Sequence, residues 1–307
     1  MCYGTSCTRT TRTQTGCAQL PWCIRQGSGA AQQSLQVLRL CDCLSRLAPT
    51  AGMHELHAID VVCLFAPHVW YWVSALFFEA AGPWLRRRGY ELQPGGHHDA
   101  GKQLVTRGSV VRTVMMQHTV SIGINWAFLA FVDGSCHGRQ LPPWPVVGLQ
   151  FIAGMILIDA WLFWMHLLMH RNRWLYRNFH AWHHRIHAPY AFSAQYNHPV
   201  EGLLLDITSG LWPLLLLRLD ARVAAALFSF TNIKIVDDHS GFSLPFDPLQ
   251  RLFANNARFH DLHHQPKHAR WNLSQPFFVW WDRLVGTLAD DCYYAGNNRG
   301  DVRKKLP

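Results

Sequence analysis

The stretch HLLMHRNRWLYRNFHAWHH, residues 166–184, begins a region that holds twelve of the nineteen histidines of the chain, residues 166–268. The histidines recur there in ordered groups: H-x3-H, then H-x2-HH, then a single histidine, then a second H-x2-HH. The members are His166, His170, His180, His183, His184, His239, His260, His263 and His264. One H-x3-H arises easily by chance, but three ordered groups favour metal binding over unrelated structural histidines.

Helical geometry gives these spacings a meaning. On an α-helix, residues four positions apart lie on one face, and we expect His183 and His263, at three positions, to join the face of their partners. Adjacent histidines such as His183 and His184 diverge by about 100° around the axis, so neighbours could bind two different metal ions. Neutral imidazole is the commonest metal ligand, and none of the nine cysteines lies in this region. A structural zinc site, which usually contains cysteine, is therefore disfavoured.

Composition predicts one catalytic unit with a large buried or lipid-facing surface, because 49% of the 307 residues are hydrophobic and 15% are charged. The mean hydropathy of −0.03 is typical of a soluble protein, because the polar ends of the chain offset its long apolar runs in the average. Residues 1–50 are rich in Thr, Gln, Gly and Arg, hold six cysteines and lack the apolar segment of a signal peptide. We expect a flexible tail. Cys41 and Cys43 are too closely spaced for a usual zinc site.

Long apolar runs predict membrane helices. Residues 61–82 can cross a bilayer core of about 30 Å and end at Pro83. Residues 110–132 contain Arg112, Gln117 and His118, and are either a weaker span or an amphipathic interfacial helix. Residues 146–165 form a clear span that leads into the first histidine group. Asp159 lies within this span, seven residues before His166, and is a candidate to orient a ligand imidazole.

Two shorter runs, residues 203–219 and 223–236, are joined by Asp220, Ala221 and Arg222. Each is short for a full crossing, so we expect a tilted or partly inserted hairpin. Such a hairpin enters the membrane and returns. It would bring His239 and the last histidine group back to the side on which His166 and His184 lie, as one metal site requires.

These observations predict an all-α fold, an integral membrane helical bundle with a cytosolic histidine-rich di-metal helical cap. The predicted division is a tail (1–50), N-terminal transmembrane helices (51–145), a catalytic domain (146–290) and a C-terminal tail (291–307). The net charge of +9 is unevenly spread. The loop of residues 83–109 carries five Lys and Arg residues and the opposite short loop only Arg139, which favours a cytosolic histidine side.

The order of the groups resembles the fatty acid hydroxylase and sterol desaturase superfamily, whose members use a histidine-held di-iron centre. Three segments are more specific: HHRIHAPYAFSAQYNHPVEGLLLD (183–206), VDDHSGFSLPFDPLQRLFANNARFHDLHHQ (236–265) and NLSQPFFVWWDRLVGT (272–287). They are similar to the sphinganine C-4 hydroxylases of fungi and plants. The resemblance covers roughly residues 61–290.

The resemblance implies that the nine histidines hold two iron ions, which use O2 to hydroxylate C-4 of sphinganine or dihydroceramide and give phytosphingosine. Electrons would come from NAD(P)H through cytochrome b5 and its reductase. Related hydroxylases have a tenth histidine four residues before the one at 239, where this chain has Ile235. His187 and His198 are candidates for that role or, with Asp159, Asp238 and Asp261, for supporting the ligands.

Other functions remain open at this stage. A sterol C-4 methyl oxidase or a lipid desaturase would keep the same histidine groups, and analysis of the products separates them. A non-enzymatic metal carrier would need polar residues along several spans, and a zinc hydrolase would show an H-E-x-x-H motif, which neither His166 nor His260 begins. No G-x-G-x-x-G fingerprint precedes a helix, so the electron donors are expected to be separate proteins. Nucleic acid is not an expected partner.

Lys304 and Lys305 resemble the dilysine signal that returns membrane proteins to the endoplasmic reticulum. Such a signal acts only when the tail faces the cytosol. We therefore expect a multi-pass protein of the endoplasmic reticulum membrane, with the histidine groups and the C-terminus in the cytosol.

Overall fold

The structure is a computed structural model that describes residues 57–95, 103–131 and 140–289. The predictions for the cysteine-bearing tail, for Arg139 and for the dilysine pair lie outside these residues.

Every regular element in the described part of the chain is a helix, which confirms the predicted all-α class. The long helices are α2 (Ala58–Arg87), α3 (Arg107–Phe131), α4 (Trp144–Arg171) and α8 (Ala221–Asp238). The short α-helices are α5 (Arg173–Asn178), α6 (Pro199–Gly202), α7 (Thr208–Leu216), α9 (Pro248–Leu252), α10 (Ala257–His264) and α11 (Trp280–Val285). Two 3-10 turns, η1 (His180–Arg185) and η2 (Ala191–Ser193), and one π-helical turn, η3 (Leu203–Ile207), complete the set.

Three helical segments are long and apolar enough to cross a membrane: α2, α4 and the continuous run Pro199–Leu216 formed by α6, η3 and α7. Large apolar side chains on their outer faces, among them Val62, Phe77 and Leu149, are exposed, as contact with lipid would require. These features fit a multi-pass membrane protein. The weaker predicted span, α3, has 25 residues and is long enough to cross a membrane, but it is less apolar than these three segments.

The predicted end of the first span at Pro83 is wrong, because α2 continues through Pro83 to Arg87. A proline inside a helix removes one backbone hydrogen bond. Here the next turn is retained by packing, since Leu85 is buried in the same core cluster as Phe78. The burial of Leu85 thus outweighs the backbone hydrogen bond that is lost at Pro83.

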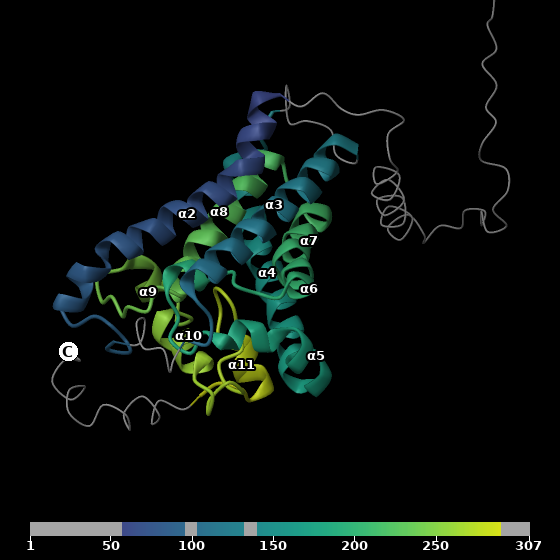
Figure 1. The fold of residues 1–307 in the computed structure, drawn as a ribbon. Coiled ribbons are helices and arrows are strands. Elements are labelled where there is room, and N and C mark those ends of the chain that lie inside the picture. The colour runs from purple at the N-terminus through teal and green to yellow at the C-terminus, as the bar shows by residue number, and fades with distance from the viewer. Residues whose placement is uncertain (1–56, 96–102, 132–139, 290–307) are drawn as a thin grey trace, which may run out of the picture. The chain divides into compact units, whose positions relative to one another are not determined.

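The two arms of the predicted hairpin are helical, and the second arm, α8, begins two residues before the apolar run. Asp220 caps α8 by accepting a hydrogen bond from the Arg222 amide at 2.9 Å. α8 then runs beside α2 (Figure 1) and also packs on α4, where a Cβ at Gly154 would lie 2.4 Å from Leu227 Cδ2. Gly154 therefore allows the close approach of α4 and α8.

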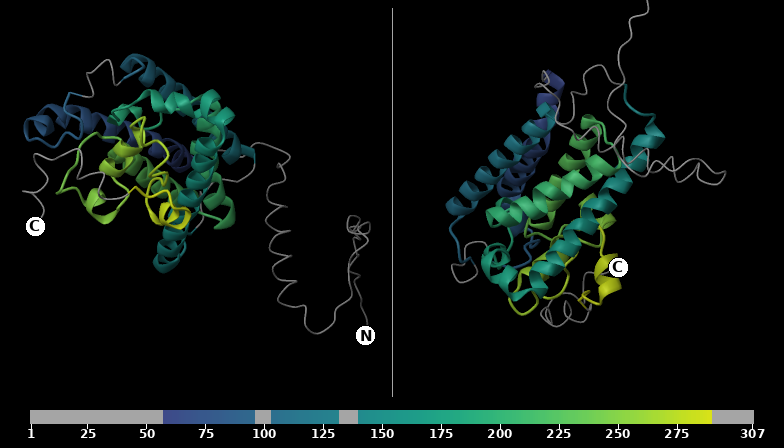
Figure 2. Two further views of the ribbon diagram at one scale, coloured as in Figure 1. Left: turned by 90° about the horizontal axis from the view of Figure 1, so that it is seen from below. Right: turned by 90° about the vertical axis from the view of Figure 1, so that its right-hand side faces the viewer.

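The short helices α9, α10 and α11 gather at one end of the long helices (Figures 1 and 2). Both α4 and α8 end there, and each has histidines at its end: His166 and His170 near the end of α4, and His239 directly after α8. A buried lysine helps to join this end to the segment before α10. Lys234 Nζ pairs with the Asp238 carboxylate and donates to the Asn255 carbonyl at 2.8 Å.

Candidate metal centre

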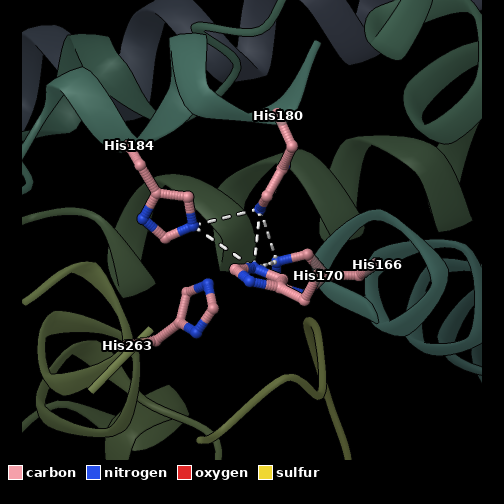
Figure 3. Close-up of side chains that lie close together, drawn as sticks. All are labelled: His166, His170, His180, His184 and His263. Atoms are coloured by element: carbon pink, nitrogen blue, oxygen red, sulfur yellow. Dashed lines mark hydrogen bonds between the residues drawn. The ribbon is translucent and has the colours of Figure 1, made fainter. Parts of the chain in front are cut away.

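Five histidines from three elements converge in what we term the first cluster (Figure 3). Their ligand atoms all lie within 4.8 Å of one another. The members are His166 and His170 of α4, His180 and His184 of η1, and His263 of α10. The Nε2–Nε2 distances are 2.8 Å for His170–His180, 3.0 Å for His166–His170 and His166–His180, 3.1 Å for His180–His184 and 3.3 Å for His170–His184.

The second cluster contains His183, His239, His260 and His264, all buried, again with ligand atoms within 4.8 Å of one another. His260 Nε2 lies 3.0 Å from His239 Nε2 and 2.9 Å from His264 Nε2. The two clusters are adjacent, because the ring centroids of His184 and His264 are 5.3 Å apart. The nine predicted histidines are thus brought together in two groups.

The division follows the i, i+4 pairs, and adjacent histidines enter different clusters. The expectation that His183 and His263 join the face of their i−3 partners is wrong, because each enters the opposite cluster. On α10, a residue at i+4 lies about 40° from the first and one at i+3 about 60° in the other direction. The two clusters lie side by side, so residues that diverge in this way enter different clusters. His180–Arg185 is a 3-10 turn and not the α-helix that the spacing argument assumed.

Backbone carbonyls orient five of the rings through Nδ1. The distances are 2.8 Å for His166 to Leu273, 3.2 Å for His183 to Tyr196, 2.9 Å for His239 to Ile235, 2.9 Å for His263 to Trp271 and 2.7 Å for His264 to Ile186. A carbonyl accepts only, so Nδ1 carries the proton and Nε2 keeps its lone pair. This is the arrangement of metal-binding histidines.

Burial keeps the imidazoles neutral. Desolvation lowers the pKa of His183 to about 4 and, with the nearby His183 ring, that of His239 to about 3. The same cause, with neighbouring imidazoles, holds the pKa of His180, His184, His260, His263 and His264 well below the usual value. The neutral imidazole is the form that binds a metal.

The donor set fits one metal ion in each cluster. His263 Nε2 is buried among the other rings without a hydrogen-bond partner in the described part of the chain, as expected of an atom that awaits a ligand. Nitrogen ligands at about 2.1 Å from an ion and at right angles lie about 3.0 Å apart, whereas tetrahedral ligands lie about 3.4 Å apart. Most Nε2 separations here are near the former value, which favours a higher coordination number than structural zinc.

Glu201, to which the sequence analysis gave no role, supports the first cluster. Its carboxylate pairs with His180 Nδ1, and both side chains are only 1% exposed. A carboxylate on the Nδ1 side fixes the tautomer and makes Nε2 a stronger donor to a metal. One feature of the sequence could have revealed it, because Glu201 is an acidic residue just before the apolar run of residues 203–219 and three residues after His198.

The remaining candidates lie outside both clusters. His198 accepts a hydrogen bond from the Val200 amide and packs on Phe179, and His187 is only half-buried. Asp238 pairs with Lys234, while Asp261 accepts hydrogen bonds from Gln93 and Gln265. None of these hydrogen bonds, ion pairs and ring contacts involves a cluster histidine. At the position of the tenth ligand, Ile235 contributes only the carbonyl that orients His239.

Asp159 does not orient an imidazole, contrary to expectation. Its buried carboxylate accepts hydrogen bonds from the Phe277 amide at 2.8 Å, the Phe278 amide at 3.2 Å and Trp281 Nε1 at 3.0 Å. These bonds fasten the segment before α11 to α4. The same segment provides the Leu273 carbonyl that orients His166, so Asp159 affects the cluster indirectly.

We expect Asp159→Ala to lower the free energy of unfolding by about 3 kcal/mol or more. The substitution leaves three donors without their charged acceptor, and each such bond contributes about 1.5–3 kcal/mol. Thermal unfolding of the purified chain in detergent measures the change. Asp220→Ala, which removes the cap of α8 and the ion pair with Arg222, should cost less, about 1–2 kcal/mol. Equal losses in the two variants would contradict the role given to Asp159.

Residues 151–287 match the fatty acid hydroxylase family. The chain is 40% identical to sphinganine C4-monooxygenase 1 of Arabidopsis thaliana, over 72% of this chain and 85% of the relative. It is 39% identical to very-long-chain aldehyde decarbonylase GL1-9 of Oryza sativa subsp. indica (73% and 86%) and 34% identical to sphingolipid C4-hydroxylase SUR2 of Saccharomyces cerevisiae (78% and 75%). No solved structure matches the chain. The chain belongs to the fatty acid hydroxylase family.

Proposed function

We propose that this protein is a membrane di-iron monooxygenase that hydroxylates C-4 of a sphingoid base, sphinganine or dihydroceramide, to give phytosphingosine. The observation that carries the proposal is the pair of adjacent clusters, built only from neutral histidines, at the end of apolar helices. The relatives named as C4-hydroxylases from a plant and a yeast support the substrate class.

In this proposal each cluster holds one iron ion through Nε2 atoms. Bound iron with O2 supplies the oxidant for an unactivated C–H bond, which no side chain can provide. The chain has other tasks. Backbone carbonyls and Glu201 hold the rings in place, and the buried surroundings exclude water from the reacting atoms.

We infer that a cavity of about 350 Å³ holds the hydrocarbon chain of the substrate. Its walls come from α2, α3, α4, α7 and α8 and are mostly apolar. Leu162 of α4 lies one turn before His166, and Ile235 of α8 one turn before His239, and both residues line the cavity. The cavity therefore borders the ends of the two helices that carry the histidines.

The proposal extends to electron supply and location. Cytochrome b5 and its reductase would deliver electrons from NAD(P)H as separate proteins, and the protein would lie in the endoplasmic reticulum membrane with the histidine clusters and the C-terminus in the cytosol. The basic residues Arg86, Arg87 and Arg88 at the end of α2 support this orientation, since cytosolic loops are rich in Lys and Arg.

The relative from rice supports a second candidate, decarbonylation of a very-long-chain aldehyde. It is nearly as similar to this chain as the plant C4-monooxygenase is. Such a reaction would use the same histidine clusters and the same apolar cavity. The two functions differ in the product, and one experiment can address both.

The chain should be expressed in a host that makes no C-4-hydroxylated long-chain bases, and its lipids analysed by mass spectrometry. We expect phytosphingosine to appear, and to be absent with the His184→Ala variant. Feeding a long-chain aldehyde to the same cells tests for alkane formation. Alkane without phytosphingosine would replace the proposed function with the second one, and neither product in cells that contain folded, iron-loaded protein would reject both.

A further inference from the structure

One part of the cavity wall is a polar patch beside Gly202. Gln117 of α3 and Asp206 of η3 both line it and both border Gly202, where a Cβ would lie 2.9 Å from Gln117 Nε2 and 3.6 Å from Asp206 Oδ2. Gln117 Nε2 donates to the Asn197 carbonyl at 2.7 Å, and Asn197 Nδ2 donates to Asp206 Oδ2 at 2.9 Å. The absence of a side chain at Gly202 allows this approach.

Two polar groups in the patch retain binding capacity. Gln117 Oε1 is buried and has no hydrogen-bond partner within the described residues. Asp206 forms no ion pair with any described Lys or Arg side chain, and its one side-chain partner is the neutral amide of Asn197. A carboxylate beside apolar walls is costly unless it is paired with a cation. The patch thus offers a carboxyl group, which a bound cation would hold ionised, and a free acceptor to a ligand.

The patch lies next to the histidine clusters through two short connections. Asn197, which donates a hydrogen bond to Asp206, directly follows Tyr196, whose carbonyl accepts a hydrogen bond from His183 Nδ1. On the other side, Gly202 directly follows Glu201, which pairs with His180. Asn197 and Gly202 therefore connect the patch to the neighbouring residues Tyr196 and Glu201, which orient one histidine in each cluster.

We propose that Asp206 binds the protonated amine of a free, single-chain long-chain base, and that Gln117 Oε1 accepts a hydrogen bond from one of its hydroxyl groups. This assignment rests on the proposed function and deepens it, because it selects the free base over its N-acylated form. In such a base the amine is on C-2, two carbons from C-4. An amine site must therefore lie beside the metal-binding end of the cavity, where Asp206 is found.

The chemistry of the amine decides between the two substrates. A protonated amine forms a charge-assisted hydrogen bond with a carboxylate. An N-acylated base has a neutral amide there and adds a second chain. The cavity of about 350 Å³ is at the small end of the range for ligand pockets, about 300–1,000 Å³, which favours one chain. Met116, Val120 and Ile124, on one exposed face of α3, line it and offer the chain an apolar entry.

The test is equilibrium binding of sphinganine and of N-acetylsphinganine to the purified full-length protein in lipid nanodiscs. Asp206→Asn keeps the hydrogen bond to Asn197 and removes only the charge. We expect it to weaken sphinganine binding at least about tenfold, which corresponds to about 1.4 kcal/mol, and to change N-acetylsphinganine binding less than about twofold. Glu79→Gln removes a carboxylate that pairs with Arg107 outside the patch, and should bind both lipids as the unchanged chain does.

The outcomes separate this inference from the proposed function. Unchanged sphinganine binding in Asp206→Asn, or equal affinity of the unchanged chain for both lipids, overturns the amine site even if phytosphingosine is formed in cells. Charge-dependent binding without any phytosphingosine supports the site and rejects the activity. If Asp206→Asn does not fold, Gln117→Leu decides, because it must weaken sphinganine binding several-fold if the patch holds the head group.

Discussion

Replacing His184 or His264 by alanine is expected to abolish the oxidation reaction and to lower the iron content of the purified chain. His184 belongs to the first cluster and His264 to the second, so each substitution removes one ligand from a different metal position. Loss of an outer hydrogen-bond partner already costs 10–100-fold in metal affinity, and loss of a ligand should cost more. Iron analysis of the purified variants and product analysis in cells measure the two effects.

A matched control is His268→Ala, four residues after His264 and outside both clusters. It should keep its iron and its activity. The two cluster variants should each lose about one iron per chain, since the clusters are distinct. Full iron content and activity in either cluster variant would contradict the two-ion arrangement. If the His184, His264 and His268 variants are all unfolded and inactive, the result would show only that histidines at this end of the molecule are needed for folding.

Glu201→Gln should lower iron affinity by about 10–100-fold and reduce activity accordingly. The amide keeps the size of the side chain, but it lacks the charge that strengthens His180 as a donor. Titration of iron into the metal-free protein, followed by its absorbance, measures the affinity. Excess iron should restore part of the activity, which would not occur if Glu201 took part in the chemistry itself.

Glu79→Gln is again the appropriate comparison, because Glu79 pairs with Arg107 and not with a histidine. Its iron affinity should equal that of the unchanged chain. Equal affinities in Glu201→Gln and the unchanged chain would show that the pairing with His180 does not support metal binding.

Periodicity was sufficient to predict the long helices and the membership of the histidine groups, because both depend on neighbours within a few residues. It was insufficient where packing between helices decides where a helix ends or which cluster a side chain enters. Pro83 does not end α2, since Leu85 is buried beyond it. His183 and His263 enter the opposite clusters, because the site has two centres and a spacing argument for one helix assumes one.

Contacts between distant parts of the chain could not be read from spacing. Asp159 binds the amides of Phe277 and Phe278, far away in the sequence, so its place on the face of His166 gave the wrong partner. For these contacts between distant segments, the resemblance to the sphinganine C-4 hydroxylases was more informative than spacing. The segment of residues 272–287 contains Asp282, whose carboxylate accepts hydrogen bonds from the Leu273 and Ser274 amides, and thereby fixes the carbonyl that orients His166.

The interleaving of the clusters has a consequence for biosynthesis. A ribosome completes His166 and His170 long before it reaches His260, and a chain that stops before that residue has only His183 and His239 of the second cluster. Neither centre can be completed from the N-terminal side alone. Such a chain has four of the five histidines of the first cluster and two of the four of the second. Both clusters therefore reach their full sets of ligands only after synthesis of nearly the whole polypeptide, which makes full occupancy of both a marker of a finished chain.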